Sequence, residues 1–156
     1  MTDGRVRRTR LLLAVIAIVG TCAGCASTAG LLAADVAAVD PRGVVDGYIA
    51  AVNRRDLSAL TAYVTPDVEW YSVANGERAL EVAGREPLKK LLEQYFERYK
   101  RTRWTIERAT AVNRSLAVAE RSEWGDDRLE SRTSLGVYEI DDGRIKRITY
   151  FLDDTQ

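Results

Sequence analysis

The sequence predicts an α+β domain in which three helices pack on a strongly curved, mainly antiparallel sheet. Three observations support this prediction. Apolar residues recur at helical spacing in the first half of residues 40–156, the second half alternates in the manner of strands, and short turn motifs separate the extended segments. Helices followed by sequential antiparallel strands are typical of the α+β class.

Three helices are expected before the main run of strands. Asp40 is a good N-cap and Pro41 suits the first position of the first helix. A short second helix starts after Asp56 and ends before Pro66. The third and strongest helix spans the segment REPLKKLLEQYFERYK, residues 85–100. Its apolar side chains lie on one side, as expected for a helix that covers a sheet: Leu88, Leu91, Leu92, Tyr95, Phe96 and Tyr99.

Extended segments surround and follow the third helix. The segment DVEWYSV, residues 67–73, alternates like a strand, and Asn75-Gly76 after it is a hairpin turn motif. After residue 100 we expect four strands, with turns at Asn113, at Gly125-Asp126 and at Asp142-Gly143. A sheet that curves around helices leaves a conical pocket, which is the kind of concave site that binds small molecules.

The first 39 residues have a different character. Residues 1–24 combine four arginines with a short apolar run, which is typical of an export signal. The segment Cys22-Ala23-Gly24-Cys25 resembles a bacterial lipobox, except that Cys22 stands where an aliphatic residue is usual. We expect a lipoprotein signal peptide over 1–24, lipidation at Cys25, a tether over 25–39 and one domain over 40–156. The alternatives are an uncleaved anchor, which would bury Asp35, and a Cys22–Cys25 disulfide.

Composition excludes several classes of function. Residues 1–24 hold four arginines and one aspartate, so the remaining chain has 19 basic and 22 acidic residues. This balance does not favour binding to nucleic acid, which requires concentrated positive charge. The chain has no histidine, which excludes Ser-His triads and most zinc sites. We expect no metal and no cofactor.

The segment LAVAERSEW, residues 116–124, leaves two interpretations open. Leu116 and Val118 share one face, and the other face holds two alanines followed by Arg121 and Glu123. In one interpretation this second face lines the pocket, where the alanines leave space and the charged pair polarises water or binds a polar ligand end. In the other it is a solvated sheet face on which the two charges coexist.

The chain resembles the NTF2-like superfamily, in its SnoaL-like and limonene-epoxide-hydrolase-like branch. The resemblance covers about residues 43–153 and rests on VVDGYIAAVNRRDLSAL, on GRE opening the third helix, and on LGVYEIDDGRIKRITYFLD. It implies a cone built of three N-terminal helices and a curved sheet. Because one fold supports many activities, the resemblance predicts the fold better than the function.

The resemblance also implies site residues. Limonene-type epoxide hydrolases use a Glu-Arg-x-Asp strand, which is similar to the segment 120–123 and implies a catalytic pair, Arg121 and Glu123. Their second carboxyl falls on Tyr150, a candidate acid, and their water-holding residues fall on Trp70 and Ser72. A helix-one tyrosine of steroid-isomerase-like proteins matches Tyr48. For the aromatic residues, the alternative role is packing in the core.

Taken together, these features predict an exported, lipid-anchored NTF2-like domain on the extracytoplasmic side of a bacterial membrane. We expect it to bind a small, mostly apolar or amphipathic molecule, with Tyr48, Trp70 and Ser72 in the ligand site. One alternative is an epoxide-hydrolase- or cyclase-like enzyme with a degenerate site of Arg121, Glu123 and Tyr150. The other is a protein-interaction domain that forms a homodimer through its sheet.

Overall fold

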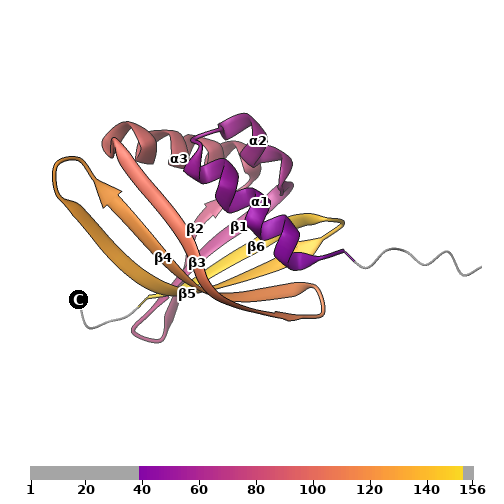
Figure 1. The fold of residues 1–156 in the computed structure, drawn as a ribbon. Helices are drawn as coiled ribbons and strands as arrows, with labels where there is room; N and C mark the ends of the chain where they lie inside the picture. The colour runs from indigo at the N-terminus through magenta and orange to yellow at the C-terminus, as the bar shows by residue number, and fades with distance from the viewer. Residues whose placement is uncertain (1–38, 153–156) are drawn as a thin grey trace, which may run out of the picture. The chain divides into compact units, whose positions relative to one another are not determined.

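The computed structural model describes residues 39–152 of the 156-residue chain. The predicted signal peptide, Cys25 and nearly all of the tether lie outside these residues. Within this described part, three helices and six strands follow one another (Figure 1): α1 (Pro41–Asn53), α2 (Leu57–Ala62), β1 (Val64–Ala74), β2 (Glu77–Ala83), α3 (Arg85–Arg98), β3 (Arg101–Val112), β4 (Ser115–Gly125), β5 (Leu129–Asp141) and β6 (Arg144–Phe151). The α+β class is confirmed.

The helices begin where their capping residues predict. The Asp40 carboxylate accepts hydrogen bonds from the backbone N–H of Arg42 at 3.0 Å and of Gly43 at 3.1 Å. Asp56 caps α2 in the same way, accepting from the Ala59 N–H at 2.9 Å. Each carboxylate satisfies backbone donors that a helix start leaves without intrahelical partners.

The six strands form one sheet in the order β2-β1-β6-β5-β4-β3. Only β1 and β6 pair in parallel, and all other neighbouring strands are antiparallel. The predicted turns at Asn75-Gly76 and Asp142-Gly143 are confirmed, since all four residues have φ between 46° and 76°. Two consecutive residues at positive φ match the right-handed twist of the hairpin strands.

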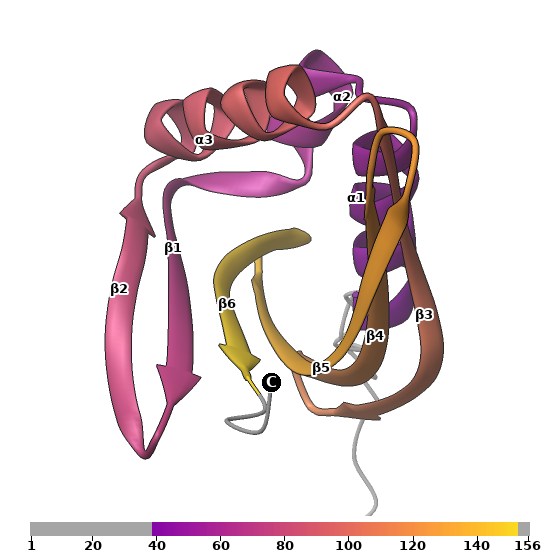
Figure 2. The same cartoon turned by 90° about the vertical axis from the view of Figure 1, so that its left-hand side faces the viewer.

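The sheet curls so that its concave face is turned toward the helices (Figure 2). In this view α2 and α3 lie across the open side of the curl, and α1 lies along β3 and β4. Register shifts in the β1–β2, β1–β6, β3–β4 and β5–β6 pairs accompany this curvature. Asn53 joins α1 to β3, because its amide both donates to the carbonyl and accepts from the N–H of Trp104, each at 2.8 Å.

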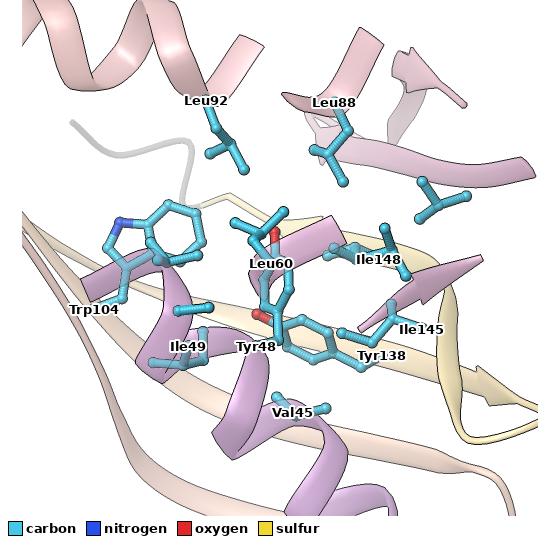
Figure 3. Packing of buried hydrophobic residues seen from close by; sticks show 14 of the residues in the cluster. Val45, Tyr48, Ile49, Leu60, Leu88, Leu92, Trp104, Tyr138, Ile145 and Ile148 are labelled. Carbon is cyan, nitrogen blue, oxygen red and sulfur yellow. The ribbon is translucent and has the colours of Figure 1, made fainter. Parts of the chain in front are cut away.

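The core fills much of the space between the helices and the concave face of the sheet. Figure 3 shows Tyr48 of α1 and Leu88 and Leu92 of α3 facing the sheet residues Tyr138 and Ile148. All five are at most 1% exposed. Burial of one such apolar side chain contributes about 1.5–3 kcal/mol to folding, so this cluster holds the helices on the sheet. None of the helices among residues 39–152 has the length and apolar character needed to cross a membrane.

Candidate functional site

The side chains of strand β4 divide between the concave face of the sheet, which is turned toward the helices, and its outer face. Leu116, Val118 and Glu120 are each about 1% exposed, whereas the Arg121 and Glu123 side chains are 47% and 29% exposed. The prediction that Arg121 and Glu123 line the pocket is wrong. Successive residues of a strand point to opposite faces, so the face that carries Leu116 and Val118 also carries Glu120 and excludes its neighbours.

Arg121 and Glu123 lie instead on the outer face of the sheet. Arg121 Nη2 is 3.4 Å from Glu123 Oε1, and no part of either residue lines the pocket described below. The alternative interpretation, in which the two charges coexist on a solvated face, describes the structure. Exposed ion pairs of this kind contribute about 0–1 kcal/mol to the free energy of unfolding. Ala117 and Ala119 belong to the same outer face.

A pocket of about 720 Å³ opens between α3 and the inner face of the sheet. Aromatic and leucine side chains make up much of its wall, and every strand contributes at least one residue. All three tryptophans of the chain line it. The lining residues are Trp70, Ser72, Glu81, Leu91, Leu92, Gln94, Tyr95, Arg98, Tyr99, Trp104, Glu120, Ser122, Trp124, Glu130, Arg132, Ser134, Tyr150 and Leu152.

Glu120 is the buried carboxyl of this pocket. Its Oε2 lies 2.6 Å from the hydroxyl of Tyr138 on β5, and both of its carboxyl oxygens lie 3.0 Å from the hydroxyl of Tyr150 on β6. The two phenol oxygens are themselves 2.6 Å apart. We call Glu120, Tyr138 and Tyr150 the buried triad. A carboxyl can be buried in this way because hydrogen bonds replace those that it made to water.

Burial dominates the ionisation of the buried triad. It raises the pKa of the Glu120 carboxyl above its usual value, and hydrogen bonds from Tyr138, Tyr150 and Ser122 oppose this shift only in part. Burial, followed by the charge on Glu120, raises the pKa of both phenols well above their usual value. The triad therefore favours its neutral form more than exposed groups of the same kinds would.

The predicted ligand residues divide between pocket and core. Trp70, Ser72 and Tyr150 line the pocket. Tyr48 does not, because its ring lies at 0% exposure inside the core, 6.3 Å from the ring of Tyr138 in an edge-on arrangement. Its hydroxyl has no hydrogen-bond partner among residues 39–152, and burial followed by the charge on Glu120 raises the pKa of this phenol.

Polar groups gather at the rim of the pocket. The Ser72 hydroxyl donates to Glu81 Oε1 at 2.5 Å, and the indole N–H of Trp124 donates to Glu130 at 3.0 Å. Arg98 and Arg132 also line the pocket, so its rim carries charges of both signs. Among residues 39–152, no three acidic or cysteine side chains lie close enough together to hold a metal ion.

Sequence reasoning missed Glu120 although the signal was present. The alternation through Leu116 and Val118 continues to residues 120, 122 and 124, and all three of these line the pocket. The small side chains of Ala117 and Ala119 lie on the opposite, outer face, so they do not mark enclosed space. The reliable signal was the shared face of two core residues, because a strand keeps its period of two even when the residues become polar.

Comparisons with known proteins place the chain in a family. The SnoaL-like domain family matches residues 45–148. An uncharacterised cystatin-fold protein from Novosphingobium aromaticivorans has 21% identity and a TM-score of 0.63 over 71% of this chain and 97% of its own. An epoxide hydrolase of the LEH-like type from M. tuberculosis has 20% identity and a TM-score of 0.62 over 72% and 82%.

TerC, crystallised with polyporic acid, has 16% identity and a TM-score of 0.60 over 72% of this chain and 91% of its own. No match was found among curated proteins. At these identities the structural likeness shows the fold alone. The helices and curved sheet described above agree with that fold, so the chain belongs to the SnoaL-like domain family and has the NTF2-like cone.

Proposed function

We propose that this domain binds a small, mostly apolar molecule in the pocket above Glu120. The observation that carries the proposal is one concave space of about 720 Å³ in which three tryptophans, two leucines of α3 and a buried carboxyl meet. Apolar walls with a few convergent polar groups are the usual character of small-molecule sites. The structural relative TerC was crystallised with polyporic acid, which supports a small-molecule role for this fold.

Tryptophan fluorescence tests the proposal directly, because every tryptophan of the chain lines the pocket. Titration with 2-isopropylnaphthalene, an uncharged aromatic probe, should change the emission in a saturable way. Ser134→Phe, which fills the pocket from β5, should abolish the change. Thr133→Phe is the matched control, because Thr133 lies on the same strand but is exposed on the opposite face. Equal binding by both variants would reject the proposal.

A second candidate function is acid–base catalysis, as in epoxide-hydrolase- or cyclase-like enzymes. The observation that favours it is the placement of Glu120 and the Tyr150 hydroxyl in the same pocket, 3.0 Å apart. A carboxyl and a phenol in contact can exchange a proton with a bound substrate. An epoxide screen that finds turnover, with loss of at least tenfold in Glu120→Gln and none in Glu123→Gln, would support this role.

We also propose that the chain is exported and anchored to the membrane through Cys25. The basic and apolar residues before it and its small neighbours Ala23 and Gly24 support this proposal. In a bacterial host expressing the full chain, Cys25→Ala should move the protein out of the membrane fraction and remove the mass of the lipid. Cys22→Ala is the matched control, and its loss from the membrane as well would contradict the assignment.

A homodimer through the outer face of the sheet is the proposed assembly. Leu135 and Phe151 are 49% and 42% exposed and lie side by side on β5 and β6, with Val73 and Ala119 next to them in the same row. Adjacent exposed apolar residues on the outer face of a sheet suit a second copy of the same face. Sedimentation should show a dimer that Leu135→Glu dissociates, whereas Val112→Glu, at a hairpin end, leaves it intact.

A further inference from the structure

The buried triad is a chain of contacts with Tyr138 at its centre. The two shortest contacts, each 2.6 Å, join the Tyr138 hydroxyl to Glu120 Oε2 and to the Tyr150 hydroxyl. The direct contacts between Tyr150 and Glu120 are longer, at 3.0 Å to each carboxyl oxygen. Tyr138 is 0% exposed and does not line the pocket, whereas Tyr150 does. Tyr150 is therefore the end of the triad that meets a ligand.

The number of protons in the triad decides where the Tyr150 hydroxyl points. With Glu120 ionised, the triad holds two protons: Tyr138 donates to the carboxylate, and Tyr150 donates either to the carboxylate or to the Tyr138 oxygen 2.6 Å away. In both arrangements the Tyr150 proton points into the triad and away from the pocket. With Glu120 neutral, a third proton is present. The carboxyl donates to Tyr138, Tyr138 donates to Tyr150, and the proton of Tyr150 is free to point into the pocket.

The walls next to Tyr150 suit an uncharged ring. The ring of Trp70 lies 5.6 Å from that of Tyr150, centre to centre, and Leu92 and Trp104 line the same pocket. The arginines of the pocket, Arg98 and Arg132, form no hydrogen bond with the buried triad. A ligand oxygen that reaches Tyr150 thus meets a phenol hydroxyl among aromatic rings and no positive charge in contact with it.

We propose that Tyr150 donates a hydrogen bond to the carbonyl or ether oxygen of an uncharged cyclic ligand, and that neutral Glu120, acting through Tyr138, keeps Tyr150 in this donating state. The proposal rests on the proposed binding function and names its ligand class. Tyr150 is the residue that contacts the ligand. Tyr138 is a positioning residue, and Glu120 sets the direction of the hydrogen bonds.

The groups that face Glu120 make its titration separable from others. The residues that face Glu120 are four tyrosines, which do not titrate near neutral pH, and one serine. They come from the elements packed around it: Tyr48 of α1, Tyr95 of α3, Ser122 of β4, Tyr138 of β5 and Tyr150 of β6. The charged residues of the same pocket are Glu81, Arg98, Glu130 and Arg132. The pKa of the Glu120 carboxyl is raised by burial, so its neutral form persists to higher pH than that of an exposed carboxyl.

Two probes of the same shape test the hydrogen bond. 2-Acetonaphthone carries a carbonyl oxygen, and 2-isopropylnaphthalene has a methyl group in its place; neither titrates. Binding of each is measured by tryptophan emission in the full chain and in Tyr150→Phe. We expect the ketone to bind about five- to tenfold more weakly to Tyr150→Phe, since one hydrogen bond is lost, and the hydrocarbon to change by less than about twofold. Tyr71→Phe, on the outer face, should change neither.

The pH dependence tests the role of Glu120. As pH rises through the raised pKa of the Glu120 carboxyl, ketone binding should weaken, because the ionised carboxylate turns the Tyr150 hydroxyl toward itself. Hydrocarbon binding should stay nearly constant over the same change. Glu120→Gln supplies an amide donor that never ionises. It should retain the ketone preference and lose its pH dependence. If Glu120 had only a structural role, its substitution would weaken the binding of both probes equally at every pH.

The outcomes separate this inference from the proposed function. If both probes bind but Tyr150→Phe weakens them equally, or if Glu120→Gln keeps the pH dependence of the unmodified chain, the inference is overturned and pocket binding stands. If neither probe binds, the inference and the proposed function both fail. Selective loss of the ketone in Tyr150→Phe, with the pH dependence removed in Glu120→Gln, supports both.

Discussion

At the scale of single residues, the site depends on how closely three buried side chains approach one another. Gly136 makes this approach possible. A Cβ at this position would lie 3.1 Å from Tyr150 Cε1, 3.2 Å from Val118 Cγ2 and 3.3 Å from Tyr138 Cε2. These distances are tighter than ordinary contacts, so the missing side chain of Gly136 lets the two phenols of the buried triad meet.

Gly136→Ala should therefore push the rings of Tyr138 and Tyr150 apart. Because the crowding lies between buried rings, we expect a loss of about 1–3 kcal/mol in the free energy of unfolding. Ketone binding should weaken more than binding of the hydrocarbon probe, because the hydrogen-bond chain is disturbed. Urea unfolding and the two-probe titration measure these effects. Gly143→Ala is the control for a glycine outside the triad. Gly143 has open space around it but a φ of 72°, so its substitution should destabilise the fold without changing the selectivity between the two probes.

At the scale of elements, one arginine side chain links the turn between the first two helices to the end of the third by hydrogen bonds. Arg55 lies in the turn between α1 and α2 with a φ of 56°, a conformation that costs energy for a residue with a side chain. Its guanidinium donates to the carbonyls of Phe96 at 3.2 Å, of Tyr99 at 2.5 Å and of Lys100. The Phe96 carbonyl belongs to the last turn of α3 and the other two follow it, where intrahelical donors are missing.

Arg55→Met removes these donors and keeps the aliphatic stem. We expect about 2 kcal/mol of destabilisation, because charged donors at a half-buried site contribute more than neutral ones. Hydrogen exchange should also become faster at the end of α3 and at the start of β3. Arg54→Met is the matched control, since the neighbouring side chain is exposed. Equal loss in both variants would show that the effect is one of general charge.

The start of α1 gives an independent test at the same scale. Asp40→Ala removes both hydrogen bonds to the first turn and should cost about 1 kcal/mol, whereas Asp40→Asn should cost less because an amide oxygen still accepts. Chemical denaturation of the purified domain measures the difference. An unchanged midpoint in Asp40→Ala would mean that packing alone determines where α1 begins.

At the scale of the whole molecule, the burial of Glu120 makes folding stability depend on pH. Its pKa is raised in the folded protein, so the folded state holds its proton more tightly than the unfolded chain does. The unfolding free energy should thus fall as pH rises from the ordinary carboxyl value of about 4.3 to the raised folded value. The slope approaches about 1.4 kcal/mol per pH unit where one proton is released.

Urea unfolding of Glu120→Gln and of the unmodified chain, compared across this range, measures the effect. The variant should lose the decline, because its amide does not ionise. The carboxylates of Asp67 and Glu69 have lowered pKa values, so their contribution to stability is lost only as pH falls through more acidic values. A decline of equal steepness in Glu120→Gln would assign the pH dependence to other groups.

Much of the fold could be predicted because its signals are local. Asp40 and Asp56 mark helix starts through hydrogen bonds to residues two or three positions away. Asn75-Gly76 and Asp142-Gly143 mark hairpins because these residue types readily adopt positive φ. The site was predicted only in part. Trp70, Ser72 and Tyr150 line the pocket, whereas Arg121 and Glu123 do not.

The amino-acid sequence alone establishes the set of elements, their order and the two faces of each strand. These properties depend on neighbours in the chain, and the alternation of β4 was readable from Leu116 and Val118. Which face of the sheet the helices cover is visible only in the tertiary structure, because it depends on the packing of α1 and α3 against strands far away in the sequence. The tertiary structure also determines which side chains surround Glu120. Tyr138 and Tyr150 lie 18 and 30 positions further along the chain, and only the pairing of β4, β5 and β6 brings their hydroxyl oxygens to the Glu120 carboxyl.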